Sequence, residues 1–385
     1  MKIIFYEMRE SWLKPVTLFM LILLTALNFV RLNDLSRTKY SLTYGDLGEA
    51  YFRIYETVCG KLDEEKISRF KSNAKELEDE VMDQVFSTEY QPDKYYTGYV
   101  WGDFMLHNVE IAPEITYCAT YPNKSNKIVT KAIECYNFYK SVENDFEMKK
   151  NAMIYSSYQD RNIPEYRATY WTGLFFQYEF SSLLCIIMLI LGLSTGFTTE
   201  KESGMYQLIT TAGQNSKTTA SKICSGAVYC FLLSGWFTVC DLLFSNILLG
   251  VRGLDMPLYS AQIFEKTPFT FSFWEAILLC TGVRFLALFA LSIMMLLVSK
   301  IAPNTLISMV MNFSVSILLI ILTAFSRSVW NPICALTPNA YITDFSVVNI
   351  FGEPVLTLYA ALIALAAECI TLGSLVFIAG RILRR

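Results

Sequence analysis

The sequence predicts an all-α integral membrane protein with six transmembrane helices and a large, mainly helical extracytoplasmic domain between helices 1 and 2. Of the 385 residues, 53% are hydrophobic and only 17% are charged, against about 25% in a typical soluble chain. The mean hydropathy is +0.35. Residues 32–172 hold 17 basic and 23 acidic side chains, a net charge of −6, whereas the remainder holds 15 and 12. A polar, acidic insert therefore lies among hydrophobic segments.

Residues 1–14 are expected to form a cytoplasmic amphipathic helix in the membrane interface. Ile4, Met8 and Trp12 share one helical stripe. The periodicity alone does not separate passive interfacial contact from docking of a cytoplasmic partner. Residues 15–31 are the first transmembrane helix. The acidic residues before it, and the lack of a small-x-small cleavage site after it, favour an uncleaved anchor over a signal peptide.

Residues 32–172 are expected to form the extracytoplasmic domain. Apolar residues recur at helical spacing in residues 63–86, 127–139 and 144–158. Residues 90–122 are rich in Tyr, Gly and Pro and are expected to form loops or short strands. This domain has an odd number of cysteines, Cys59, Cys118 and Cys135. One disulfide among them is left open, but a disulfide framework is excluded.

The region 173–385 contains transmembrane helices 2–6. They are expected at residues 173–199, 223–251, 274–299, 301–326 and 354–380. Basic residues in short loops are biased to the cytoplasmic side of a membrane. With the N-terminus inside, ten basic residues lie inside and three in the short outer loops. Both termini of this multi-pass protein are therefore predicted to be cytoplasmic.

The composition also argues against several enzyme classes. The chain has one histidine, His107, so a multi-histidine metal site is excluded. It has no phosphate-binding loop of the Gly-x-x-x-x-Gly-Lys-Ser/Thr type. We therefore expect no enzymatic activity, no metal site and no cofactor bound by this chain.

Four ionisable residues fall inside the predicted spans, namely Glu179, Asp241, Arg284 and Glu368. Such groups are costly in hydrocarbon, so they face one another, water or the protein interior. A rise of 1.5 Å per residue places Asp241 and Arg284 at the same depth, roughly 15 Å from the outer ends of consecutive spans. We expect them to form a structural ion pair. A substrate or ion pathway lined by Glu179 and Glu368 is the alternative function for these charges.

The loop at residues 200–222 carries the most specific motif. It opens with Glu200 and Glu202, continues with Ser-Gly204 and a short apolar helix that contains Leu208, and breaks at Gly213. Together with six spans and an N-terminal interfacial helix, this loop resembles the coupling-helix region of type-2 ABC transporter permeases. The resemblance covers the whole chain in topology but only about 25 residues in motif. Gly213 departs from the proline that many relatives have there.

The resemblance implies how the chain would work. Glu200, Glu202, Gly204 and Leu208 would contact a separate ABC ATPase subunit, which would bind the ATP and Mg. A second permease, in a homo- or heterodimer, and membrane lipid would be the other partners, with no nucleic acid. The assembly would sit in a bacterial plasma membrane and export a peptide, drug, lipid or ion.

Two other functions remain open at this point. A membrane-bound peptide sensor or immunity protein would bind its ligand through residues 32–172 without transport. An integral membrane enzyme is disfavoured because the spans and inner loops contain no histidine and no clustered carboxylate pair.

Overall fold

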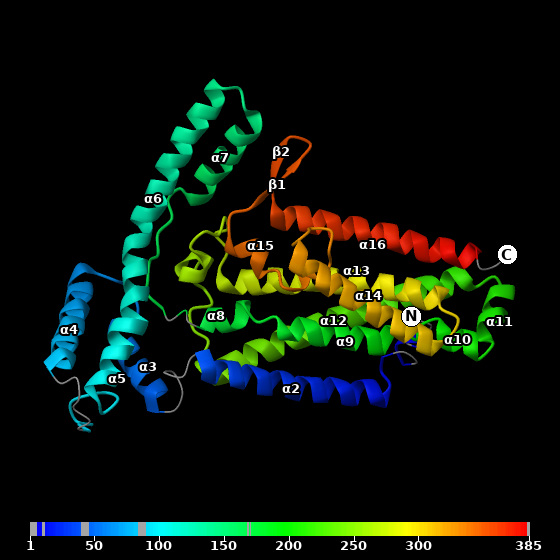
Figure 1. The fold of residues 1–385 in the computed structure, drawn as a ribbon, viewed down its shortest axis with the longest axis horizontal. Coiled ribbons are helices and arrows are strands. Elements are labelled where there is room, and N and C mark those ends of the chain that lie inside the picture. Colours follow the sequence, from blue (N-terminus) through cyan, green and yellow to red (C-terminus); the bar gives the residue numbers. More distant parts are fainter. Residues whose placement is uncertain are drawn as a thin grey trace.

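The computed structural model describes residues 6–9, 12–39, 46–83, 90–167, 169 and 171–382. Within these residues, six helical segments are long and apolar enough to cross a membrane, which confirms the predicted number. They are Pro15–Arg37, Trp171–Glu202, Asn215–Leu249, Phe273–Ile301, Thr305–Phe325 and Thr357–Gly380. The segments lie side by side as a bundle, with the polar domain, residues 46–169, at one end (Figure 1). We call this end the domain end, and the other, where the first and last described residues lie, the distal end.

The bundle helices differ from the apolar runs mainly in length. They are α2 (Pro15–Lys39), α9 (Phe180–Leu193), α12 (Asn215–Leu249), α13 (Phe273–Ile301), α14 (Thr305–Phe325) and α16 (Thr357–Ile382). The first continues beyond its expected end at residue 31, and α12 begins before residue 223. With 35 residues, α12 is about 52 Å long, whereas the hydrocarbon core is about 30 Å thick. Its first turns therefore extend beyond the hydrocarbon at the distal end.

The second span is interrupted, whereas the sequence predicted one continuous helix over residues 173–199. Helix α8 (Trp171–Phe176) ends before residues 177–179, and α9 begins at Phe180. The hydroxyl of Tyr178, in the break, donates to Asn28 Oδ1 of α2 at 2.7 Å. The break coincides with three polar residues, Gln177, Tyr178 and Glu179, within an otherwise apolar span.

Helices α2 and α12 pack in parallel along their length. Side chains meet in the pairs Trp12–Ser225, Thr25–Trp236 and Asn28–Asp241. These pairs are 213, 211 and 213 residues apart in the sequence, so both helices advance together in the same direction. Because the two helices keep a nearly constant offset in sequence, polar side chains at successive turns of α2 each meet a polar partner on α12. Trp12 also stacks on Tyr229, with ring centroids 4.9 Å apart.

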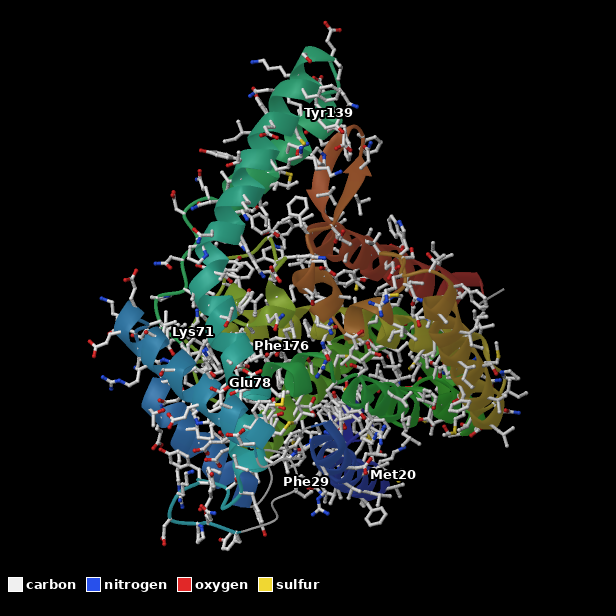
Figure 2. The ribbon with its side chains drawn as sticks, turned by 60° about the vertical axis from the view of Figure 1, so that its left-hand side comes forward. Met20, Phe29, Lys71, Glu78, Tyr139 and Phe176 are labelled. Carbon is white, nitrogen blue, oxygen red and sulfur yellow. The ribbon has the colours of Figure 1, made fainter. Side chains whose placement is uncertain are left out.

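The polar domain is built from helices. They are α3 (Asp46–Val58), α4 (Glu64–Asp83), α5 (Val100–Phe104), the π-helix η2 (Met105–Ile111), α6 (Ala112–Ser141) and α7 (Asp145–Tyr158). Helices α4 and α7 match the helices expected at residues 63–86 and 144–158, and α6 contains the one expected at 127–139 but begins 15 residues earlier. Helices α6 and α7 form an antiparallel hairpin that projects away from the bundle (Figure 1). Lys71 and Glu78 lie on the outer surface of α4, and Phe29 lies on α2 at the rim of the bundle (Figure 2).

The prediction of loops or short strands for residues 90–122 is wrong from residue 100 onward, where the chain is helical. One proline of this stretch lies in the first turn of α6, where a missing N–H costs nothing. The other, Pro122, lies inside α6. Its neighbours Tyr117 and Tyr121 are buried in the core, which indicates that tertiary packing overrides the local preference.

A buried arginine fastens the polar domain to the loop between α12 and α13. Arg161 lies between the rings of Tyr158 and Tyr259, 4.3 and 4.8 Å from their centroids. Its Nη1 donates to Tyr121 Oη at 3.1 Å and to the carbonyl of Thr267 at 2.9 Å. The hairpin α6–α7 and the loop therefore share one cation, and the domain is held against the bundle.

Short elements complete the domain end. They are the 3₁₀ turns η3 (Leu258–Ser260), η4 (Gln262–Phe264) and η5 (Cys334–Leu336), helix α15 (Asn339–Thr343), and the antiparallel strands β1 (Val347–Ile350) and β2 (Glu353–Leu356). Among the described residues, the β1–β2 hairpin is the one departure from the predicted all-α class. Its Glu353 forms an ion pair with Lys149 of α7. Cys59, Cys118 and Cys135 are free thiols.

The six-span arrangement predicts opposite exposure of two lysines. Lys71 on α4 and Lys217 on α12 are both exposed and belong to opposite ends of the bundle. In a cysteine-free background, Lys71→Cys is expected to react with an impermeant maleimide in intact cells, and Lys217→Cys only after permeabilisation. Reaction of both in intact cells would contradict the topology.

The Arg161 contact predicts a large loss of stability on substitution. Arg161→Met removes two stacking contacts and hydrogen bonds from a buried cation, and is expected to cost about 3 kcal/mol. Thermal denaturation of the detergent-solubilised protein measures this loss. Arg53→Met, which removes an exposed i,i+4 pair with Glu49, is the control and is expected to change stability by less than about 0.5 kcal/mol.

Candidate functional site

The loop at the distal end forms two short helices instead of one. Helix α10 (Thr198–Glu202) contains both glutamates of the motif, and α11 (Met205–Thr211) contains Leu208. Between them Gly204 adopts φ = 75°, a left-handed conformation that favours glycine. Gly213 adopts φ = 71° just after α11, where the sequence predicted the helix to end. The two glutamates therefore do not lie on the helix that carries Leu208.

Helix α11 presents apolar side chains to the outside of the protein. It has no buried residue, and Leu208 and Met205 are 63% and 50% exposed. It lies at the distal end beside α10 (Figure 1). Neighbouring apolar side chains exposed on a water-facing helix are typical of a protein–protein contact.

Glu200 faces into the protein, where it joins a buried charge cluster. Lys222 Nζ, on α12, lies 2.9 Å from Glu200 Oε1 and 2.7 Å from Glu7 Oε2 in the N-terminal segment. All three side chains are largely buried. This triad ties α10, α12 and the N-terminal segment together, so the carboxylate of Glu200 is engaged inside the protein.

The next two residues of α10 bind the ends of two other spans. Lys201 Nζ donates to the carbonyls of Lys300 and Ala302, at 2.6 and 2.8 Å, where α13 ends. Glu202 accepts from the backbone N–H and the hydroxyl of Thr305, at 2.7 and 3.0 Å, where α14 begins. A cation at a helix C-terminus and an anion at an N-terminus both interact favourably with the helix dipole. Helix α10 is therefore clamped between α13 and α14.

Lys300 extends this cluster to α12 and α16. It is 1% exposed, and its Nζ donates to Thr219 Oγ1 at 2.7 Å. A Cβ atom on Gly380 of α16 would lie 2.6 Å from the same nitrogen, so a larger residue there would displace the ammonium group. Lys222 and Lys300 are two of the ten basic residues expected on the cytoplasmic side. Their position next to apolar runs gave no sign that they are buried.

The structure contains the predicted contact between Asp241 and Arg284. Arg284 Nη1 lies 3.8 Å from Asp241 Oδ2, and both side chains are largely buried. The closest partner of this aspartate is Asn28 of α2, whose Nδ2 donates to Oδ1 at 2.7 Å. Arg284 also donates to the carbonyl of Leu336, at 3.3 Å. Asn28 was missed because a single asparagine in an apolar run carries no pattern.

Glu179 and Glu368 are not brought together. Glu179 lies in the break before α9 and lines a cavity of about 670 Å³ with Arg31, Arg327 and residues of α14. Glu368 lies within α16 and does not line this cavity. One of its carboxylate oxygens is buried without a hydrogen-bond partner among the described residues. A single pathway lined by both glutamates therefore stays a prediction.

The Asp241–Arg284 contact predicts a partial rescue. Arg284→Met leaves a buried carboxylate without its cation and is expected to cost about 3 kcal/mol. Adding Asp241→Asn removes the unpaired charge and should recover part of that loss. Thermal denaturation of the two single variants and the double variant in detergent measures the coupling, and strictly additive losses would mean that the two groups do not interact.

A comparison with protein families finds one match. The family model described as "ABC-2 family transporter protein" matches residues 14–378. No curated protein and no solved structure matches the chain. The match extends from the start of the first span almost to the end of the last, and it confirms the resemblance drawn from the loop motif and the topology. The chain belongs to the ABC-2 family of transporter proteins and is a membrane-spanning transport permease.

Proposed function

We propose that this permease is driven by a separate ABC ATPase that docks on α11, and that the assembly exports its substrate from the cell. The observation that carries the proposal is the contrast between the two helices of the distal loop. Helix α11 exposes Leu208 and Met205, whereas every charged residue of α10 is bonded to another part of the bundle. One helix is free to receive a partner, and the other is built to transmit its movement.

The bonds of α10 reach the spans that would have to move. Glu200 leads through Lys222 to α12, Lys201 to the end of α13, and Glu202 to the start of α14. A ligand shifts a conformational equilibrium only through interactions that differ between the two states. An ATPase whose ATP-bound and empty forms place α11 differently would change the strain on these bonds, and so would bias the bundle.

The substrate and its path are part of the proposal. The cavity of about 670 Å³ that contains Glu179 opens beside α2, α9 and α14 and is large enough for a small molecule or part of a peptide. A second permease, in a homo- or heterodimer, would close the open sides of this path. The exported substrate would be a peptide, a drug, a lipid or an ion.

The orientation of the bundle in the membrane is inferred from the distribution of its basic residues. Outside the long insert, ten basic residues belong to the terminal segments, the distal loop or the end of α13, against three in the short loops of the domain end. We infer that the distal end is cytoplasmic, where the ATPase and its ATP and Mg are available, and that the polar domain is extracytoplasmic. The membrane would be a bacterial plasma membrane.

The proposal predicts separate effects on docking and on transmission. Leu208→Ser removes an apolar contact and is expected to weaken binding of the co-purifying ATPase about tenfold. The size-matched control Leu208→Met should bind like wild type. Glu202→Gln leaves the surface of α11 intact but weakens the charge-assisted bond to Thr305. This variant should bind the ATPase while losing most of the change in ATP hydrolysis that the permease causes.

These outcomes are measured by co-purification from native membranes, followed by ATP hydrolysis of the reconstituted complex. Wild-type chain that brings down no ATPase would contradict the proposal outright. Equal binding by Leu208→Ser and wild type would move the docking site away from α11.

A further inference from the structure

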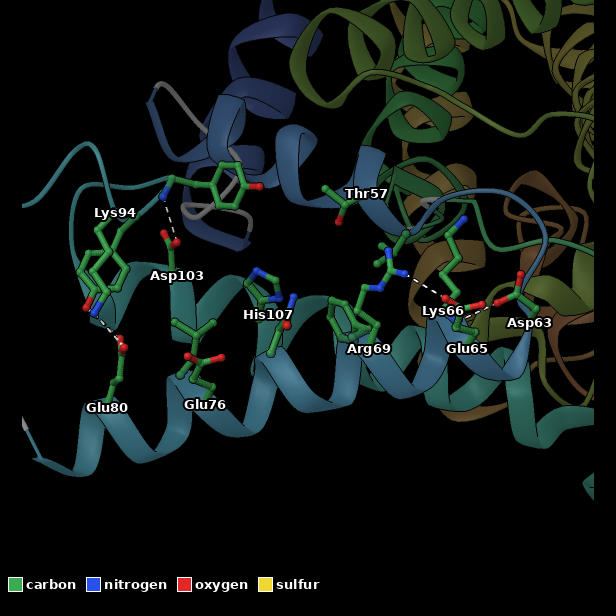
Figure 3. Close-up of a pocket in the computed structure, with 16 residues that line it drawn as sticks. Thr57, Asp63, Glu65, Lys66, Arg69, Glu76, Glu80, Lys94, Asp103 and His107 are labelled. Carbon is green, nitrogen blue, oxygen red and sulfur yellow. Dashed lines mark hydrogen bonds and ion pairs between the residues drawn. The ribbon is translucent and has the colours of Figure 1, made fainter.

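The polar domain contains a cleft that the transport function does not use. It lies between α4 on one side and α5 and η2 on the other, and Thr57 and Val58 at the end of α3 line it as well (Figure 3). Its volume is about 630 Å³, which is within the range of ligand-binding sites. None of the residues that line it lines the cavity that contains Glu179. The cleft is therefore a separate site.

His107 lines this cleft with a buried polar atom that lacks a partner. The residue is 6% exposed, and its ring stacks on Phe70 of α4 at 5.2 Å. Its Nδ1 is buried and has no hydrogen-bond partner among the described residues. Buried polar atoms are nearly always hydrogen-bonded, so an unpaired one on a side chain that lines a cleft indicates a position for a ligand group.

The backbone that carries His107 is unusual as well. Residues Met105–Ile111 form a π-helix between α5 and α6. Such segments are rare and frequently occur at functional sites. Burial lowers the pKa of His107, opposed by the nearby Asp103, so the imidazole is neutral at pH 7 and can accept as well as donate a hydrogen bond.

The charges of the cleft favour a cationic ligand. Five carboxylates line it against three cations, which gives a net charge of −2. Several of these charges are already paired: Arg69 with Glu65 at 3.0 Å, and Lys94 with Glu80 at 2.8 Å. Asp103 accepts from backbone N–H groups.

Glu76 stands apart from these pairs. Within the described part of the chain it has no ion-pair or hydrogen-bond partner, and it faces the same cleft as His107 (Figure 3). Asn73, three residues earlier on α4, also lines the cleft. The carboxylate of Glu76, the amide of Asn73, the imidazole of His107 and the ring of Phe70 therefore line the same cleft.

We propose that this cleft binds a cationic peptide segment, with an ammonium or guanidinium group at Glu76 and a polar group of the peptide at His107 Nδ1. The side chain of Asn73 supplies a further donor and acceptor for peptide groups. Phe70 and Leu77 provide the apolar surface of the cleft. Binding at this site depends neither on the ATPase nor on the docking surface of α11.

The single histidine of the chain provides a direct test. Full-length protein with ¹³C-labelled histidine and a histidine-free purification tag is placed in phosphatidylcholine nanodiscs. Its imidazole signals are followed while trilysine or triglutamate is added at constant ionic strength. Trilysine is expected to shift the signals saturably, and triglutamate to leave them unchanged. No shift with trilysine, or equal shifts with both peptides, would overturn the proposal.

Two variants of α4 separate the cleft from general surface charge. Glu76→Gln is expected to weaken trilysine binding at least fivefold. Glu78→Gln removes the same charge from an exposed position of α4 outside the cleft and should change the affinity less than twofold. Asn73→Lys, which places a cation in the cleft, should weaken binding as well. Unchanged imidazole signals without peptide establish that each variant is folded, and equal effects of the Glu76 and Glu78 variants would exclude a specific site.

Discussion

The buried ammonium of Lys222 is the interaction on which the distal end depends. It is held between Glu7 and Glu200, so the N-terminal segment, α10 and the start of α12 meet at one nitrogen atom. A charge in such a position is tolerated only while its partners remain in place, because an unpaired buried ion costs several kcal/mol. Any rearrangement of α10 must therefore carry the N-terminal segment and the start of α12 with it, or break the triad.

The two ends of the protein are connected through α13. At the domain end its first turn is fixed by a capping box between Ser272 and Glu275, just after the loop that Arg161 binds. At the distal end its last carbonyls accept from Lys201. One continuous helix thus joins the attachment of the polar domain to the clamp on α10. A rigid element of this kind can relate a change at the polar domain to a change at the docking surface.

Composition and local pattern were sufficient for the main features of the fold. Six apolar runs predicted six spans, and Gly213, which adopts a positive φ, marked the end of α11. The division of the loop into two helices at Gly204 was not predicted. What could not be predicted depends on partners that are distant in the sequence. The break in the second span, the helical course of residues 100–122 and the burial of Lys300 all arise from tertiary contacts. The same holds for Asn28, which has no distinguishing neighbours within α2.

The parallel packing of α2 against α12 has a consequence for biosynthesis. Asn28 and its partner Asp241 are separated by 213 residues. At about 5–20 residues per second, a ribosome adds that length in roughly 10–40 s. During this interval α2 has to reside in the membrane with the Nδ2 of Asn28 unpaired, until α12 is made. The contact between α2 and α12 therefore forms late, and α2 must be stable in the membrane without α12 while the polar domain is synthesised.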